Sequence, residues 1–181
     1  MTRFENCVAF VLAHEGEYSD DSRDLGGKTC FGVSWKAWPK EADSIIALYQ
    51  SGKKEEARQQ AIALYRNEYW ERLKVDRLRL PLDLAMLDAA VNLGPERAVR
   101  LLQLECNRQL RASLKLDGVL GPATLRAANA LPATLAAIGV CGQRLNAYAK
   151  MPRDTRQAHL TGWVRRVADL VLGIAGSAQG S

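Results

Sequence analysis

Residues 14–29 read HEGEYSDDSRDLGGKT, and they join the end of a predicted helix to an acidic, glycine-rich loop. The helix is predicted because apolar residues recur through residues 4–12 at the three- and four-residue spacing of one helical face. Glu15 lies three residues after Leu12 and four after Val11, so it belongs to the same apolar face. The sequence therefore places a carboxyl group on the apolar side of a helix, at its last turn.

Two features of this position are expected to raise the pKa of Glu15. An apolar setting disfavours the charged form of a carboxyl group, and so does the negative end of a helix dipole. A glycosidase needs one carboxyl group that is still protonated near neutral pH, and it usually needs a second carboxylate as well. Glu15 is therefore a candidate catalytic acid, and a solvated helix-terminal glutamate is the structural alternative.

The loop after the helix supplies further carboxyl and hydroxyl groups. Asp20, Asp21 and Asp24 lie within nine residues of Glu15, and the Gly26-Gly27 pair permits a turn that other residues avoid. An Asp-rich turn with side-chain-to-backbone hydrogen bonds is the structural alternative. Calcium is disfavoured because the loop lacks the alternation and the terminal Glu of an EF-hand, and we predict no metal site and no cofactor.

This stretch resembles the N-terminal pattern of the glycoside hydrolase 108 family, the N-acetylmuramidase lysozymes of phages and bacterial secretion loci. The matching residues are His14-Glu15-Gly16, Tyr18, Asp21, Asp24, Gly26-Gly27, Thr29 and Phe31-Gly32-Val33. The match is specific because these residues agree in register over a short span. It implies a mainly α, lysozyme-like fold with a long catalytic loop, including a possible short hairpin, after the first helix.

The resemblance implies that Glu15 is the catalytic acid and that Asp24 and Thr29 are functional loop residues. Asp24, together with Thr29, would orient water or offset positive charge at the anomeric carbon of the sugar. The sequence departs from the family pattern at Leu25, where proline is common, and at Cys30-Phe31, where Asn-Tyr is common.

Three further residues are expected to contact the substrate. Tyr18 could stack on a sugar ring, Asp21 lies in the matching loop, and Asn92 could form part of the cleft wall. Glu17 stands where a second glycine is common, and we expect it to be exposed on the opposite side of the turn from Glu15.

Other chemically notable residues have stronger structural interpretations. Asp88 falls on an apolar helix face, and a buried Asp is costly unless it is hydrogen-bonded, so we expect it to hold a loop or a helix end in place. His14 is expected to cap carbonyl groups or to pack, with proton transfer beside Glu15 as the alternative. Trp35 and Trp38 could line a saccharide groove, although core positions are commoner for tryptophan.

The second half of the chain resembles the helical peptidoglycan-binding module that is usually fused to this catalytic domain. The matching residues are Asn92, Gly94, Arg97-Ala98, Leu102-Gln103, Asn107, Asp117-Gly118, Leu120-Gly121-Pro122, Thr124-Leu125, Leu160, Gly162-Trp163 and Arg166-Val167. We therefore expect a catalytic region at 1–92, a peptidoglycan-binding region at 93–176 packed against it, and a frayed tail at 177–181.

The apolar periodicity and the turn residues predict a series of helices. We expect them at 3–15, 41–50, 53–73, a stretch that begins near Pro81, 96–112, 122–130, 132–150 and 155–172, with the residues after 172 frayed. Thr2 and Glu5 form a T-x-x-E capping box before the first helix. Few strands are indicated, so the predicted fold is mostly helical.

Composition limits the possible partners. The 181 residues carry a net charge of +5, which favours an anionic cell wall, while the absence of a Lys/Arg run or a recognition-helix motif argues against nucleic acid. The four cysteines contain no CxxC pair, so zinc is not indicated, and Cys7 is expected to be a small buried hydrophobe. We find no signal-peptide core and no stretch suited to stable membrane insertion.

The sequence therefore predicts a monomeric N-acetylmuramidase that cleaves the β-1,4 bond between N-acetylmuramic acid and N-acetylglucosamine in peptidoglycan. It would be made in the cytoplasm and would act in the periplasm or cell wall after holin release, as a phage or prophage endolysin, or after specialised secretion. The alternatives are a secretion-linked or interbacterial-effector muramidase, a non-catalytic wall-binding protein, and a helical DNA-binding protein suggested by charge alone.

Overall fold

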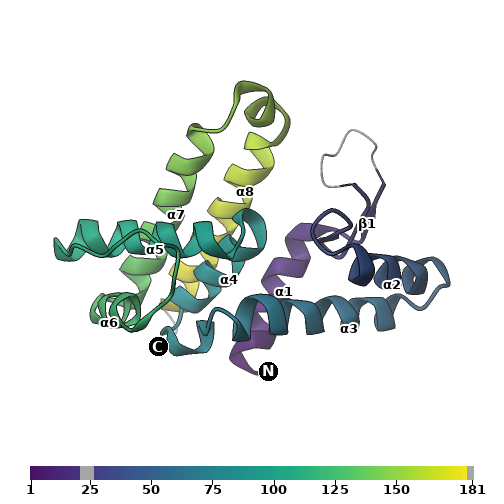
Figure 1. The fold of residues 1–181 in the computed structure, drawn as a ribbon, viewed down its shortest axis with the longest axis horizontal. Helices are drawn as coiled ribbons and strands as arrows, with labels where there is room; N and C mark the ends of the chain where they lie inside the picture. Colours follow the sequence, from purple (N-terminus) through teal and green to yellow (C-terminus); the bar gives the residue numbers. More distant parts are fainter. Residues whose placement is uncertain (21–26, 179–181) are drawn as a thin grey trace. The chain divides into compact units, whose positions relative to one another are not determined.

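A computed structural model describes residues 1–20 and 27–178, and the mainly α prediction is confirmed (Figure 1). The described part contains eight α-helices and a small three-stranded sheet. The chain divides into two compact units, an N-terminal unit at Met1–Glu71 and a C-terminal unit at Arg72–Ser181. The boundary predicted from the sequence, between residues 92 and 93, separates two regions that resemble different families, and it need not coincide with the division into compact units. It stays a prediction.

The N-terminal unit begins with helix α1, Arg3–Glu15, as predicted. Thr2 and Glu5 form the expected capping box, in which each side chain binds the other residue's backbone N–H. The predicted apolar face is buried, and the ring of Phe4 meets that of Trp70 edge-on, with centroids 5.5 Å apart. Glu15 is the last residue of this helix, and Gly16 ends it in a left-handed conformation, with φ of 73°.

A three-stranded antiparallel sheet follows the first helix, one strand more than the hairpin expected from the sequence. Its strands are β1 (Tyr18–Ser19), β2 (Thr29–Cys30) and β3 (Val33–Ser34). Ser19 lies opposite Thr29, which lies opposite Ser34, so Thr29 belongs to the central strand. Asp21 and Asp24 lie outside the described residues.

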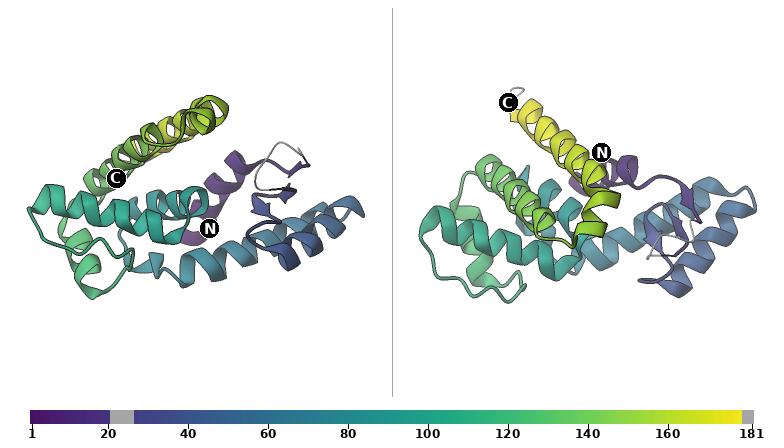
Figure 2. Two further views of the ribbon diagram at one scale, coloured as in Figure 1. Left: turned by 45° about the horizontal axis from the view of Figure 1, so that its top comes forward. Right: turned by 90° about the horizontal axis from the view of Figure 1, so that it is seen from above.

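Two α-helices follow the sheet in the N-terminal unit: α2, Pro39–Gln50, and α3, Lys54–Tyr65. They lie side by side in Figures 1 and 2. The single helix expected at 53–73 is wrong, because α3 gives way to a π-helical segment, η1, at Arg66–Glu71. The wider π turn lets two successive aromatic side chains serve different contacts, since Trp70 packs on α1 while Tyr69 contacts Trp38.

The C-terminal unit consists of one 3₁₀ turn and five α-helices, and each of the five begins at a proline or directly after one. The elements are η2 (Val75–Arg77), α4 (Leu82–Leu93), α5 (Pro95–Leu110), α6 (Pro122–Ala130), α7 (Ala133–Ala149) and α8 (Arg153–Ala178). Figure 2 shows α7 and α8 lying side by side. The expectation that the chain frays after 172 is wrong, because α8 continues to Ala178 and Ile174 is fully buried.

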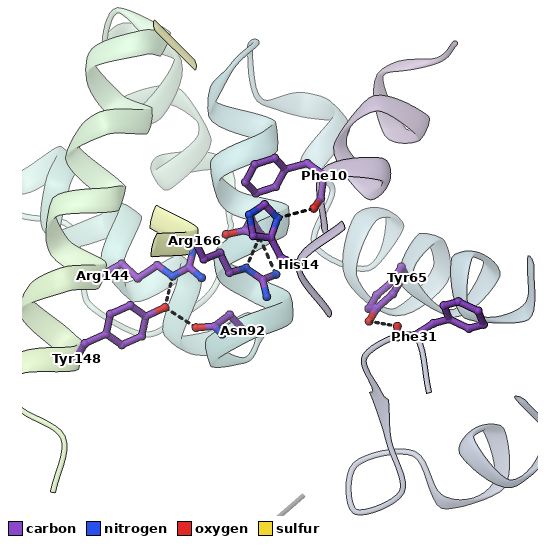
Figure 3. A network of polar contacts seen from close by, with 9 residues as sticks. Phe10, His14, Phe31, Tyr65, Asn92, Arg144, Tyr148 and Arg166 are labelled. Atoms are coloured by element: carbon purple, nitrogen blue, oxygen red, sulfur yellow. Dashed lines mark hydrogen bonds and ion pairs between the residues drawn. The ribbon is translucent and has the colours of Figure 1, made fainter. Parts of the chain in front are cut away.

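A buried polar network crosses three helices of this unit. Asp88 on α4 is completely buried and forms ion pairs with Arg144 of α7 and Arg166 of α8. Arg144 also donates to the hydroxyl of Tyr148, which donates in turn to Asn92 (Figure 3). The structural role predicted for Asp88 is confirmed, although its partners are helical arginines rather than a loop.

The remaining expectations about the chain concern cysteines, metals and membranes. All four cysteines are buried, in agreement with the interpretation of Cys7 as a small buried hydrophobe. Within residues 1–20 and 27–178, no group of three or more His, Cys, Asp or Glu side chains could hold a metal ion. In the same residues no single helix has the length and apolar character of a membrane span. Only the pair α6 and α7, whose axes are bent by 113° at the break between them, reaches that length and apolar character when taken together.

Candidate active site

Glu15 lies where α1 meets the small sheet, and its side chain is half-buried. The turn between β2 and β3 packs directly against it. A Cβ atom added to Gly32 would lie 2.6 Å from Cγ of Glu15 and 2.4 Å from the hydroxyl oxygen of Tyr65. Only glycine fits at this position, so the hairpin and α1 together fix the place of the candidate acid.

The turn that contacts Glu15 has an unusual backbone. Phe31 and Gly32 are the two residues between the paired Cys30 and Val33, and both are left-handed, with φ of 48° and 78°. Positive φ at both central residues is typical of a type I′ hairpin turn, but a bulky residue such as Phe31 rarely adopts it. The carbonyl of Phe31 accepts a 2.8 Å hydrogen bond from the buried hydroxyl of Tyr65, which holds the turn in this conformation (Figure 3).

An aromatic cluster extends from Tyr65 along the π-helical segment. The rings of Tyr65 and Tyr69 have centroids 5.6 Å apart, and the indole Nε1–H of Trp38 donates to the Tyr69 hydroxyl over 3.3 Å. Burial raises the pKa of Tyr69 above its ordinary value, and the negative charge of Glu15 adds to this, while the bond from Trp38 opposes it. Tyr69 therefore remains a neutral hydroxyl within the electrostatic reach of Glu15.

The second glutamate of the stretch, Glu17, is exposed, as predicted. Its carboxylate accepts hydrogen bonds from Lys54 over 3.1 Å and from the hydroxyl of Tyr49 over 2.9 Å. The bond from Lys54 is the main reason that the pKa of Glu17 lies below its ordinary value, with Tyr49 adding to it. Glu17 is thus held as an anion and is poorly suited to donate a proton.

The other predicted site residues of the N-terminal unit are distributed around the sheet. Tyr18 stacks on Tyr49, with centroids 5.6 Å apart and ring planes 20° from parallel. Thr29 lies on the central strand, two residues before the Phe31-Gly32 turn that touches Glu15. The structure therefore brings Glu15 and the strand of Thr29 together. Asp21 and Asp24 cannot be placed among them because they lie outside the described residues.

His14 and Asn92 have defined structural contacts. Nδ1 of His14 lies 2.9 Å from the carbonyl oxygen of Phe10, and the two rings pack with centroids 4.4 Å apart, which is the capping role predicted for it. Asn92 belongs to the C-terminal unit, where its side-chain oxygen accepts a hydrogen bond from the hydroxyl of Tyr148.

A pocket of about 430 Å³ lies beside the aromatic cluster, between α2, α3 and η1. Trp38 forms part of its wall, together with the amide side chains of Gln60 and Asn67 and the hydroxyl of Ser44. A half-buried indole beside several amide and hydroxyl groups suits a polar ring compound such as a sugar. One of the two tryptophans considered for a saccharide groove therefore lines a pocket.

Gly32, Tyr65 and Tyr69 are parts of the site to which the sequence pattern assigned no functional role. Gly32 matches the family pattern, but the match by itself implies no function for it. The two tyrosines are four residues apart, so they share a helical face, and that spacing was the signal available in the sequence. The π-helical segment that brings Tyr69 toward Trp38 has no comparable signal.

The chain is mostly helical, and its first helix ends with a carboxyl group beside a small sheet that contains a tight hairpin turn. Tyrosine side chains lie next to this turn. These are features of a lysozyme-type glycoside hydrolase. Comparison with known proteins supports this class. The family model described as glycosyl hydrolase 108 matches residues 8–94, and the one described as a predicted peptidoglycan domain matches residues 97–168. The first of these matches assigns residues 8–94 to the glycosyl hydrolase 108 family.

A solved structure agrees with the family assignment. The structure of SagA from Brucella abortus is similar to this chain with a TM-score of 0.75 and 27% identity, covering 96% of this chain and 94% of SagA. No curated protein matches the chain. The two modules make the protein a peptidoglycan-degrading muramidase with peptidoglycan as its substrate.

Proposed function

We propose that Glu15 is the general acid of this muramidase and protonates the glycosidic oxygen of the β-1,4 bond between N-acetylmuramic acid and N-acetylglucosamine. The observation that supports this role is the close packing of Gly32 on the Glu15 side chain, in a turn that the Tyr65 hydroxyl holds through the carbonyl of Phe31. A catalytic carboxyl group must be held in a fixed position relative to the leaving oxygen, and a glycine turn braced by a buried tyrosine provides such support.

Asp24 and Thr29 complete the proposed chemistry. Asp24 would orient water or offset the positive charge that develops at the anomeric carbon, and the Thr29 hydroxyl would assist it. Thr29 is suitably located on the central strand, close in sequence to the turn that touches Glu15. Tyr18, Asp21 and Asn92 are proposed to contact the glycan.

The proposed setting follows from the substrate. The enzyme would act as a monomer in the periplasm or cell wall, without nucleic acid or stable membrane insertion, after holin release as an endolysin or after specialised secretion. Its net charge of +5 suits an anionic sacculus.

The decisive experiment compares the variants Glu15→Gln and Glu17→Gln on purified sacculi. Each substitution removes one carboxylate from the same short stretch, but Glu17 is exposed and held by Lys54 and Tyr49. We expect Glu15→Gln to lose about 10²–10⁴-fold in lysis rate, the usual contribution of a general acid, and Glu17→Gln to stay within a few-fold of wild type.

Mass spectrometry of the released fragments identifies the bond that is cleaved. Wild type and Glu17→Gln should leave a reducing end on N-acetylmuramic acid. Undiminished lysis by Glu15→Gln would remove Glu15 from the mechanism. Binding of sacculi by wild type without release of reducing ends would instead indicate a non-catalytic wall-binding protein.

A further inference from the structure

A second pocket, of about 360 Å³, lies entirely within the C-terminal unit. It forms where the end of α4, the first turns of α5 and the end of α7 meet. Its lining residues are Leu93, Arg97, Arg100, Leu101, Ala147, Lys150, Met151 and Pro152. The pocket contains none of the residues assigned to the catalytic site.

The charged part of this wall is entirely basic. Arg100 is engaged by the carboxylate of Glu96 and donates over 3.2 Å to the carbonyl of Leu116. Arg97 and Lys150 are exposed, and neither side chain forms a hydrogen bond or an ion pair with the described residues of the chain. The first turn of α5 adds the positive end of its helix dipole, and the one acidic side chain of that turn, Glu96, is paired with Arg100.

The rest of the wall is apolar. Leu93 and Leu101 come from neighbouring helices, and Met151 and Pro152 follow the end of α7. A pocket that combines two cationic side chains without ion-pair partners, Arg97 and Lys150, with small apolar surfaces fits a ligand that carries carboxylates and methyl groups close together. A neutral glycan offers no charge for these cations, and a simple polyphosphate offers no apolar part.

We propose that this pocket binds the stem peptide of peptidoglycan, with Arg97 and Lys150 pairing its free carboxylates and the leucines and Met151 contacting its alanine methyl groups. The proposal rests on the peptidoglycan substrate assigned above and extends it from the glycan to the peptide. The N-terminal unit would act on the sugar chain while the C-terminal unit recognises the peptide attached to it.

The test measures binding of a free stem tetrapeptide to the full-length wild-type chain by titration calorimetry. The peptide contains no glycosidic bond, so the result does not depend on Glu15 or on turnover. The double variant Arg97→Gln/Lys150→Gln should bind the peptide about five- to tenfold more weakly, since each exposed ion pair contributes a few-fold. The same peptide with amidated carboxyl groups should bind wild type with a similar loss.

The matched control is Arg126→Gln/Lys115→Gln, which removes one arginine and one lysine from exposed positions of the same unit outside the pocket. It should bind like wild type, and thermal unfolding should show both double variants folded. The proposal is overturned if both double variants weaken binding equally, if the amidated peptide binds as well as the free acid, or if no binding is detected. Inorganic phosphate that competes as strongly as the peptide would also overturn it, since the pocket would then select charge alone.

Discussion

Glu15 in the N-terminal unit and Asp88 in the C-terminal unit are both carboxyl groups on helices, yet their surroundings differ in kind. Asp88 is completely buried and fixed by two arginines from two other helices. Glu15 is half-exposed, packs against a glycine turn and lies within the electrostatic reach of Tyr69. The first arrangement neutralises a charge that the fold must bury, whereas the second keeps a carboxyl group accessible and fixes its position.

Glu105 extends the comparison, because it also packs against a glycine. A Cβ atom added to Gly139 of α7 would lie 2.0 Å from Oε1 of Glu105, which resembles the contact of Gly32 with Glu15. Glu105 is nevertheless almost fully buried and receives hydrogen bonds from Arg108, Gln109 and Gln143. A glycine beside a glutamate is thus not sufficient to indicate catalysis, and the exposure of the carboxyl group distinguishes the two sites.

Replacing Asp88 should give the largest effect on stability. In Asp88→Ala, the buried guanidinium groups of Arg144 and Arg166 lose their carboxylate, and breaking a buried ion pair from one side costs about 3–5 kcal/mol. Denaturant unfolding measures this loss directly. Glu15→Gln should stay within about 1 kcal/mol of wild type, because Glu15 is half-exposed and the change is isosteric. The contrast between the two carboxyl groups fails if Glu15→Gln is the more destabilised variant.

The two glycine contacts should separate stability from activity. Gly32→Ala places a Cβ at φ of 78°, against Glu15 and Tyr65, and the left-handed conformation alone costs about 1–2 kcal/mol. Because the clash also displaces the candidate acid, we expect lysis to fall at least tenfold in protein that remains folded.

Gly139→Ala is the counterpart in the C-terminal unit. Its Cβ would meet a glutamate held by several partners, so thermal unfolding should occur at a lower temperature. The rate at which the folded variant cleaves a soluble, peptide-free glycan should remain close to that of wild type. Equal losses of this rate in the two glycine variants would show that the Gly32 contact has no special relation to catalysis.

The pH dependence of stability should reflect Glu105 rather than the catalytic site. Burial raises the pKa of Glu105, but hydrogen bonds from Arg108, Gln109 and Gln143 outweigh it, so the folded-state pKa lies below the ordinary value. A group with a depressed folded-state pKa stabilises the fold above its unfolded-state pKa, and this contribution is lost as the pH falls through the folded-state pKa. Glu105→Gln should therefore have a lower melting temperature near neutrality and a smaller further decrease on acidification below about pH 4. Parallel melting curves for variant and wild type from pH 7 to pH 3 would contradict this.

The sequence predicted those features that depend on local pattern. The apolar spacing of residues 4–12 predicted α1 and the phase of Glu15, and prolines and glycines placed most of the later helices within two or three residues. Asp88 was recognised as a buried acid because it interrupts an apolar helix face. Each of these inferences needs only neighbours in the chain.

Other features depend on contacts between distant segments, which a single sequence does not reveal. The π turn at Arg66–Glu71 follows from packing of Trp70 on α1 and of Tyr69 on Trp38. The continuation of α8 beyond 172 follows from the burial of Ile174, despite the glycines around it. The pairing of Arg144 and Arg166 with Asp88 was not predicted, because this shared partner lies 56 and 78 residues away in the sequence.

Tyr69→Phe should give the smallest effect, and it tests how the aromatic cluster contributes. The substitution removes the hydroxyl that accepts the Trp38 indole N–H and retains the ring that packs on Tyr65. Loss of one such hydrogen bond is worth about 1 kcal/mol, so we expect a decrease in kcat of less than tenfold. The matched control is Tyr49→Phe, which removes the hydroxyl that donates to Glu17 instead and should leave kcat unchanged.

If both substitutions lower kcat equally, the hydroxyl groups near either glutamate act only through the general stability of the fold. If only Tyr69→Phe lowers kcat, the π-helical segment helps to position the Glu15 carboxyl group. The two units would then also differ in how the carboxyl group is held, by neutral hydroxyl groups around Glu15 and by arginines around Asp88.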